Sequence, residues 1–402
     1  MSYICDSKSF LFEIEYNVNY KKIFWEAIKV IDQRLVKLAE LLVNYSTEVK
    51  AGDKVSIKAE DIAMPFIIEV AKAAVKKGAF VDYSVTVPEI EEAILKYGNE
   101  EQLSKPNNDY GAAVKESDVW ITAWGSKNSR SRSNIPPDLL QKRRQANKAE
   151  REIYVNKSAT GELRWCGTQF PTNAEAQEAE MSLSEYEEFV YKAGMLDKED
   201  PVAEWKKVEA NQERWVKFLN TKKEIHIVSK DTDITVGVDG RKWINCCGKE
   251  NFPDGEIFTS PEENKINGVI SFSYPAIYSG RIVEGVKFEV KDGKIIKATC
   301  DKGADFLLAC LDTDEGSRYF GEVAIGTNYN IKKFTRNILF DEKIGGTIHM
   351  AIGCAMPETG GKNKSAIHWD MICAMQDGGK IYADDQLFYE NGKFIESVLA
   401  EF

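Results

Sequence analysis

Apolar side chains recur at helical spacing near the start of the chain. The positions that lie three or four residues apart are Ile23, Ala27, Ile31, Leu35 and Leu38. This periodicity predicts a long amphipathic helix over residues 22–48. A second helix is predicted over residues 64–77, because Gly78 stands where a helix commonly ends in a left-handed glycine.

Short apolar runs around this second helix predict strands. Residues 55–59 and 79–85 flank the helix, and residues 118–125 form a further run that ends in a glycine. A strand, a helix and a second strand in succession are typical of a parallel sheet. The first half is therefore predicted to be an α/β domain. It carries neither G-x-G-x-x-G nor a P-loop motif, so a nucleotide-binding function is not indicated.

Residues 172–219 again show a helical, Glu-rich pattern that Asp200-Pro201 interrupts. Since such a break suits a hinge, the chain is divided here into an N-terminal domain, 1–195, and a C-terminal domain, 205–402.

Beyond residue 224 the pattern changes to short β runs separated by Gly and Asp turns. The clearest is a hairpin over residues 286–297, in which Asp292-Gly293 joins two runs. Helices are predicted over residues 303–311 and after His349. The C-terminal domain is thus predicted to be α+β and rich in antiparallel strands.

The net charge of the protein indicates which classes of partner it can bind. The 402 residues include 53 Lys and Arg against 64 Asp and Glu, a net charge of −11. An acidic protein repels a phosphate backbone. The basic stretch over residues 127–151 carries no interleaved aromatic residues, so we interpret it as a solvated surface. We therefore expect no nucleic-acid partner. No run of 18 apolar residues occurs, so no membrane span is expected. The first residues do not resemble a signal peptide, and we expect a cytoplasmic protein.

The eight cysteines form no C-x-x-C pair, so they are expected to be small buried side chains rather than metal ligands. The chain has three histidines. His226 lies in an alternating strand and is interpreted as a residue of its solvated face. His368 and Asp370 are two positions apart, so on a strand they share a face, where imidazole and carboxylate could bind a metal or simply be solvated.

Further groups that suit a metal site lie close to this pair in sequence. His349 precedes it by nineteen residues, and the polar, Gly-rich tract between can bring the two segments together. Acidic residues follow turn glycines at Glu256 and Glu322, and Glu342 could act as a general base beside a metal. The chain contains neither G-x-S-x-G nor H-E-x-x-H, which argues against a serine nucleophile and a zinc-binding helix.

Six stretches in order add a family resemblance. They are residues 231–237, 251–261, 320–324, 337–342, 346–353 and 363–370. Together they resemble the thermophilic aminopeptidase family of metallopeptidases, and the N-terminal α/β half is compatible with it.

The resemblance implies a site with two divalent ions, usually zinc, cobalt or magnesium, in the C-terminal domain. The implied metal ligands are Glu256, Glu322, His349, His368 and Asp370, with Glu322 bridging the ions. Glu342 matches the acid that activates the attacking water. The implied activity is removal of N-terminal residues from peptides with a free amine, by a homodimer joined through its C-terminal domains.

Met356 departs from the family pattern, which has tyrosine seven residues after the metal-binding histidine. A tyrosine hydroxyl can donate a hydrogen bond to a developing oxyanion, whereas a thioether cannot. An alternative therefore stays open, in which the same fold binds metal without peptidase turnover or acts on another small molecule. A single iron held by His349, His368 and Asp370 is one form of this alternative.

Overall fold

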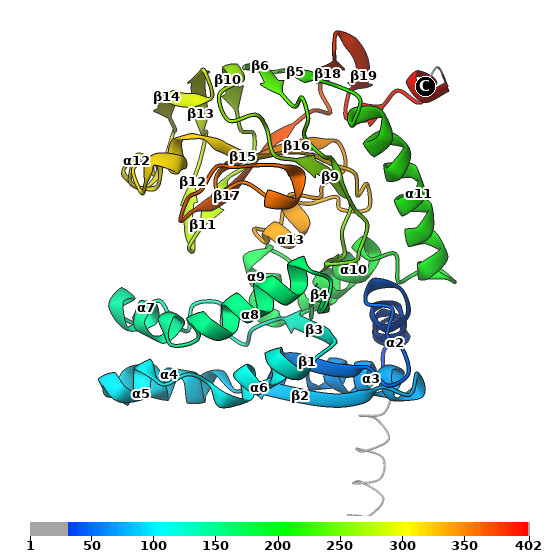
Figure 1. The fold of residues 1–402 in the computed structure, drawn as a ribbon, viewed down its shortest axis with the longest axis vertical. Coiled ribbons are helices and arrows are strands. Elements are labelled where there is room, and N and C mark those ends of the chain that lie inside the picture. Colours follow the sequence, from blue (N-terminus) through cyan, green and yellow to red (C-terminus); the bar gives the residue numbers. More distant parts are fainter. Residues whose placement is uncertain (1–30, 401–402) are drawn as a thin grey trace, which may run out of the picture.

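The computed structural model describes residues 31–400, which form two parts stacked on one another (Figure 1). The first part contains a parallel sheet of five strands in the order β2-β1-β3-β4-β8. Its strands are β1 (Lys54–Glu60), β2 (Phe80–Thr86), β3 (Val119–Trp124), β4 (Arg164–Gln169) and β8 (Asn251–Phe252). The predicted α/β fold with a parallel sheet is confirmed for this part.

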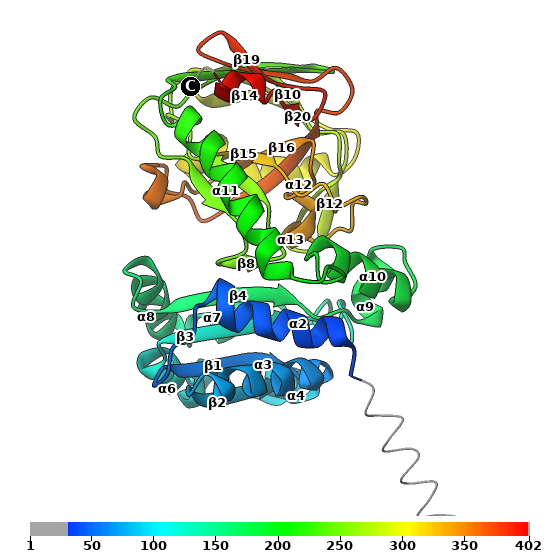
Figure 2. The same ribbon diagram turned by 90° about the vertical axis from the view of Figure 1, so that its right-hand side faces the viewer.

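Helices surround this sheet and lead to the second part. They are α2 (Gln33–Leu41), α3 (Met64–Lys76), α4 (Pro88–Tyr97), α5 (Glu100–Ser104), α6 (Asn108–Glu116), α7 (Pro137–Gln145), α8 (Lys148–Ala159), α9 (Asn173–Glu178), α10 (Leu183–Ala193) and α11 (Pro201–Leu219). The long helix α11 runs along the side of the second part (Figure 2).

Of the helix predicted over residues 22–48, the part before residue 31 lies outside the described residues. The later part is confirmed, as α2 followed directly by a π-helical turn, Leu42–Ser46. Within the described residues, α2 begins only at Gln33, because the Asp32 carboxylate caps it by accepting a hydrogen bond from the Arg34 backbone N–H at 2.8 Å. Apolar periodicity did not reveal this start, because a cap interrupts the backbone without interrupting the pattern.

The second part is built mainly from antiparallel strands. They are β5 (Glu224–Ser229), β6 (Thr232–Gly237), β7 (Ile244–Cys246), β9 (Glu256–Thr259), β10 (Ile266–Ser271), β11 (Ala276–Tyr278), β12 (Arg281–Val283), β13 (Lys287–Lys291), β14 (Lys294–Thr299), β15 (Phe320–Gly326), β16 (Thr347–Gly353), β17 (His368–Ala374), β18 (Lys380–Ala383), β19 (Gln386–Glu390) and β20 (Lys393–Phe394). The helices here are α12 (Ala304–Leu311), α13 (Ile338–Asp341) and α14 (Ser397–Ala400). The predicted hairpin is β13 and β14, with Asp292 and Gly293 both at positive φ.

These strands form an eight-stranded sheet, β14-β13-β10-β6-β5-β18-β19-β20, and a five-stranded sheet, β17-β16-β15-β9-β7, besides the small pair β11-β12. Apolar side chains of both larger sheets, such as Ile234 and Met350, belong to one buried core. The five-stranded sheet lies between the eight-stranded sheet and the first part (Figure 1).

The helix predicted after His349 is wrong. Residues 347–353 form β16, and only a short 3-10 turn, Pro357–Thr359, follows. All seven residues of β16 are buried, so the strand lacks the alternation that distinguishes a strand from a helix in sequence.

The two parts share structure across the predicted boundary. Strand β8 comes after it in sequence yet pairs with β4, and Phe340 and Ile344 lie in the core of the first part. The division into 1–195 and 205–402 stays a prediction. Among residues 31–400, no helix has the length and apolar character needed to cross a membrane.

Candidate metal centre

Strand register brings the five predicted ligands to one face of the five-stranded sheet. Residues directly opposite each other in an antiparallel pair point to the same face. Gly353 lies opposite His368, and Ala351 lies opposite both Asp370 and Glu322. His349 precedes Ala351 by two positions, and Glu256 lies opposite Gly326 on the same face. The alternate residues, such as Met350 and Trp369, face the core.

The side chains on this face approach one another closely. Nε2 of His349 lies 3.2 Å from Oε2 of Glu256 and 3.4 Å from Oε1 of Glu322. Nε2 of His368 lies 3.3 Å from Oε2 of Glu322 and 3.5 Å from Oδ1 of Asp370. Glu322 thus directs one oxygen to each histidine, and two groups of potential ligands share this one carboxylate.

Glu342 lies beside the same cluster. One of its oxygens lies within 4.8 Å of ligand atoms of His349 and Asp370. It follows directly after α13, a one-turn helix that Asn337 caps by accepting a hydrogen bond from the Leu339 backbone N–H. The structure therefore gathers all six predicted residues although they span more than a hundred positions of the chain.

Unpaired buried atoms indicate that these residues suit a metal. Both ring nitrogens of His349 and Oε2 of Glu256 are buried and have no hydrogen-bond partner among the described residues. A buried polar atom without a partner is costly, whereas a bound cation would satisfy it. Imidazole nitrogens together with carboxylate oxygens are ligands that zinc and similar divalent ions accept. The donor set fits a divalent metal.

The electrostatics of the cluster favour added positive charge. Burial opposes the charged imidazolium of His368, but Asp370 and Glu322 outweigh it and raise the pKa of His368 to about 12. Burial also opposes ionisation of Glu256, yet Lys343 and His349 lower the pKa of Glu256 to about 2. Carboxylates that stay ionised at such depth hold cations strongly.

Lys343 is a component of the centre that the sequence analysis missed. Its side chain is 1% exposed, and Nζ hydrogen-bonds Oε1 of Glu256 and, at 2.7 Å, Oε1 of Glu342. Asp254 lies 3.7 Å away on another side. A lysine is usually a surface residue, so only its position directly after Glu342 could have drawn attention to it.

A backbone contact orients His368. Its Nδ1 lies 2.8 Å from the carbonyl oxygen of Cys354, on the loop after β16. In the neutral ring, Nδ1 would donate its proton to this carbonyl, and Nε2 would be the lone-pair nitrogen that faces Glu322 and Asp370. This is the tautomer that a metal ligand requires.

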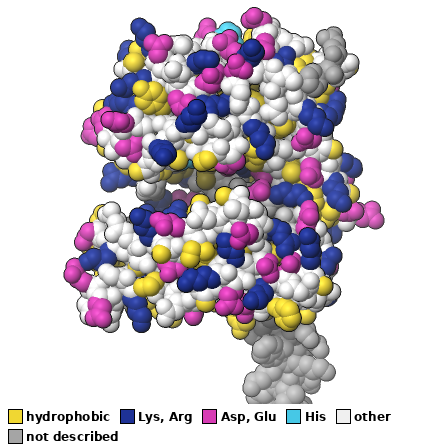
Figure 3. Space-filling model, viewed as in Figure 1, with side chains coloured by type: hydrophobic (Ala, Val, Ile, Leu, Met, Phe, Trp, Pro, Cys, Tyr) yellow, Lys and Arg dark blue, Asp and Glu magenta, His cyan; other side chains and the backbone are white. Residues whose placement is uncertain are grey.

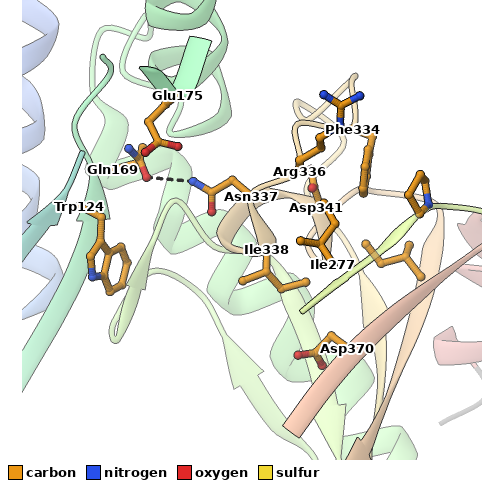
Figure 4. A pocket seen from close by; sticks show the side chains of 12 residues that line it. Trp124, Gln169, Glu175, Ile277, Phe334, Arg336, Asn337, Ile338, Asp341 and Asp370 are labelled. Atoms are coloured by element: carbon orange, nitrogen blue, oxygen red, sulfur yellow. Dashed lines mark hydrogen bonds between the residues drawn. The ribbon is translucent and has the colours of Figure 1, made fainter. Parts of the chain in front are cut away.

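An open cavity of about 360 Å³ reaches this centre from between the two parts (Figure 4). Asp370 lies on one wall, and Trp124 and Glu175 of the first part lie on the other. Nδ2 of Asn337 donates a hydrogen bond to Oε1 of Gln169 at 2.9 Å and so ties the two walls together. A substrate could enter here and approach Asp370.

Two other residues that the sequence analysis singled out belong to none of these groups of potential ligands. Met356 is on the loop after β16, where its N–H donates to Oγ of Ser260 at 3.0 Å, and it does not line the cavity beside Asp370. His226 pairs with Asp233 on a partly exposed strand face, as predicted. The cysteines of the described residues form no disulfides.

Comparison with known proteins identifies the family. The model of the thermophilic metalloprotease (M29) family matches residues 31–394. The chain belongs to this family. The predicted resemblance is confirmed, and so is the predicted class, a metallopeptidase and hence a hydrolase.

Two curated relatives are aminopeptidases. Aminopeptidase AmpS of Bacillus subtilis is 27% identical, over 86% of this chain and 93% of the relative. Aminopeptidase T of Thermus thermophilus is 26% identical, over 90% and 96%. The solved structure of wild-type AmpT from Thermus thermophilus superimposes with a TM-score of 0.79 at 24% identity, covering 90% of this chain and 99% of AmpT. This last likeness supports the fold.

Proposed function

We propose that this protein is a metal-dependent aminopeptidase that releases N-terminal residues from peptides at a site for two divalent ions. The observation that carries the proposal is the position of Glu322, which directs one oxygen to each of two histidines. Glu256 and His349 would hold one ion, and His368 and Asp370 the other. The shared carboxylate favours two ions over the single iron of the alternative hypothesis.

Divalent ions bound here would polarise the scissile carbonyl and activate water. Glu342 would accept the proton of the attacking water and pass it to the leaving amine. Burial raises the pKa of Glu342 to about 8, more than the charge of Lys343 lowers it. A carboxyl group with a pKa near neutrality can both take up and release a proton in one cycle.

Zinc, cobalt and magnesium are the proposed metals, and a peptide with a free N-terminus is the proposed substrate. A cytoplasmic homodimer is proposed as the working form. The family and its aminopeptidase relatives support the substrate class. The ligand types support the metals.

Metal analysis combined with peptide turnover tests the proposal. We expect two divalent ions per chain, hydrolysis of unblocked dipeptides, and no hydrolysis of their N-acetylated forms. Glu322→Gln should lower the metal content below two, because it removes the shared carboxylate, while Glu289→Gln, on a distant exposed position of β13, should not. One iron per chain with no hydrolysis would refute the proposal.

A further inference from the structure

A second, larger cavity of about 740 Å³ lies in the first part of the molecule. It opens at the carboxyl ends of β1 and β3, where Lys58, Glu60, Thr122 and Trp124 line it. The chain leaves β1 for β2 on one side and returns to β3 on the other, so the sheet order reverses between β1 and β3. In open parallel sheets, ligands bind at such a switch point.

This cavity adjoins the one beside the metal centre. Trp124 and Glu175 line both cavities. Figure 4 shows the two side chains on the wall facing Asp370, and Figure 3 shows the molecule hollowed between its two parts. A ligand that contacts Asp370 at one end can therefore extend into the second cavity.

Several positively charged side chains line the second cavity. Arg132, Arg144 and Arg151 are among them, and none of these three forms a salt bridge within the described part of the chain. Lys58 lies there too, with its ammonium 5.1 Å from the centre of the Tyr110 ring. The three arginines come from the basic stretch that sequence alone suggested to be a solvated surface. In the fold they line a cavity instead.

The acidic groups of the cavity do not balance these cations. Glu91 lies 3.8 Å from a fourth arginine, Arg143. Glu175 accepts a hydrogen bond from Ser126 at 3.3 Å. Glu60 is the third acidic residue of the lining, against five basic ones, Lys58, Arg132, Arg143, Arg144 and Arg151. The cavity therefore has an excess of positively charged side chains in a protein whose net charge is −11.

We propose that the basic cavity binds the C-terminal carboxylate of a short peptide whose N-terminus lies at the metal centre. This inference rests on the proposed aminopeptidase function, which places the free amine near Asp370. An extended peptide advances about 3.3–3.6 Å per residue away from that point, and the arginines line the adjoining cavity. Guanidinium groups recognise carboxylates through charge-assisted hydrogen bonds. The preferred substrates are then oligopeptides with a free carboxyl end.

Two peptides that differ only at the carboxyl end test this inference. For trialanine and its C-terminal amide, we expect the wild-type kcat/KM to favour the acid by about tenfold, as one charge-assisted hydrogen bond would. The double variant Arg144→Gln, Arg151→Gln should bring the ratio close to one, because kcat/KM for the acid falls more than kcat/KM for the amide. Lys148→Gln is the matched control, since this exposed lysine of α8 pairs with Glu152 at 3.9 Å and does not line the cavity.

Direct binding separates this inference from the proposed function. Quenching of tryptophan fluorescence by N-acetyl-trialanine and by its amide reports on Trp120 and Trp124 without any turnover. Tighter binding of the acid, lost in the double variant, supports the anion site even if no peptide is hydrolysed. Hydrolysis with equal kcat/KM for acid and amide, or a preference that persists in the double variant, overturns the anion site and leaves the proposed function intact.

Discussion

Buried charges of opposite sign face one another at the candidate metal centre. Glu256, Glu322 and His349 are each no more than 5% exposed, and Lys343 is 1% exposed. Isolated charges at this depth would be strongly destabilising, so each needs a partner. Lys343 supplies one for Glu256 and Glu342 within the chain. The ring nitrogens of His349 have no hydrogen-bond partner among the described residues, and a bound cation would supply one.

Removing the ammonium of Lys343 should therefore lower the stability of the protein most when no metal is bound. Lys343→Met leaves Glu256 and Glu342 buried without their cation, and such a loss typically costs about 3–5 kcal/mol. In chelator, we expect a melting temperature well below that of the wild type. Zinc should recover much of the difference, because its charge neutralises the same carboxylates.

Differential scanning fluorimetry with chelator and with zinc measures this effect. Lys206→Met, at an exposed position of α11, serves as the control. An equal loss of melting temperature in both conditions would mean that Lys343 contributes packing rather than charge.

Met356 is expected to affect the rate of peptide hydrolysis rather than the stability of the fold. The family pattern has tyrosine at this position, and a missing oxyanion donor typically costs about a hundred- to a thousandfold in rate. We expect slow wild-type hydrolysis of aminopeptidase substrates and a faster Met356→Tyr variant. Steady-state kinetics on an unblocked dipeptide measure both enzymes. An ordinary wild-type rate with no gain from tyrosine would show that Met356 is not a deficit.

At the scale of elements, a short helix and its preceding turn hold the proposed base in place. The Asp341 carboxylate, at the end of α13, accepts hydrogen bonds from the N–H and hydroxyl of Thr335 at 2.7 and 2.9 Å. These bonds close the turn just before α13, so that Glu342 emerges beside His349 and Asp370. A one-turn helix could not keep this position by its own hydrogen bonds.

Asp341 should also make stability depend on pH. Burial raises the pKa of Asp341 to about 7, more than its hydrogen bonds lower it. The folded state thus binds this proton more tightly than the unfolded chain, whose pKa is about 3.9. The contribution of Asp341 to stability is complete at acidic pH and is lost as the pH rises from about 4 through 7.

Asp341→Asn removes this loss, because an amide does not ionise and its oxygen can still accept from Thr335. The free energy of unfolding of the variant, relative to the wild type, should therefore increase between pH 5 and pH 8. Urea denaturation in chelator at the two pH values measures it, with the exposed Asp377→Asn as control. A difference that does not change with pH would contradict the assignment.

At the scale of the whole molecule, the first part forms one wall of the cavity that leads to the candidate metal centre. The strand β8 joins the parallel sheet from far along the chain, and Asn337 bonds to Gln169 across the cavity. The shared core around Phe340 makes the two parts depend on each other. Substrate would thus meet a wall from each part.

A homodimer joined through the second part is the prediction that belongs to this scale. Light scattering at micromolar concentration should give about twice the chain mass of 45.3 kDa. The predicted contact should survive Arg144→Gln, which lies in the first part. A monomeric mass at that concentration would contradict the prediction.

Local patterns accounted for much of the fold. The alternation of strands and helices indicated the parallel sheet of the first part, and Asp292-Gly293 indicated the β13–β14 hairpin of the second part. Both signals depend on residues that are neighbours in sequence. The start of α2 and the strand β16 were missed. A capping side chain and burial on both faces leave little trace in apolar periodicity.

The sequence by itself determined which types of potential metal ligand the protein has and to which family the protein belongs. Residue type and spacing suffice to suggest a metal site. The signals are the three histidines, the histidine and aspartate two positions apart, and the acidic residues that follow turn glycines. Tertiary structure decided the rest. Antiparallel register gathers the side chains on one face of a sheet, buries Lys343 among them, and directs the arginines of the basic stretch to a cavity. Those outcomes depend on contacts between residues far apart in the chain, which no local pattern encodes.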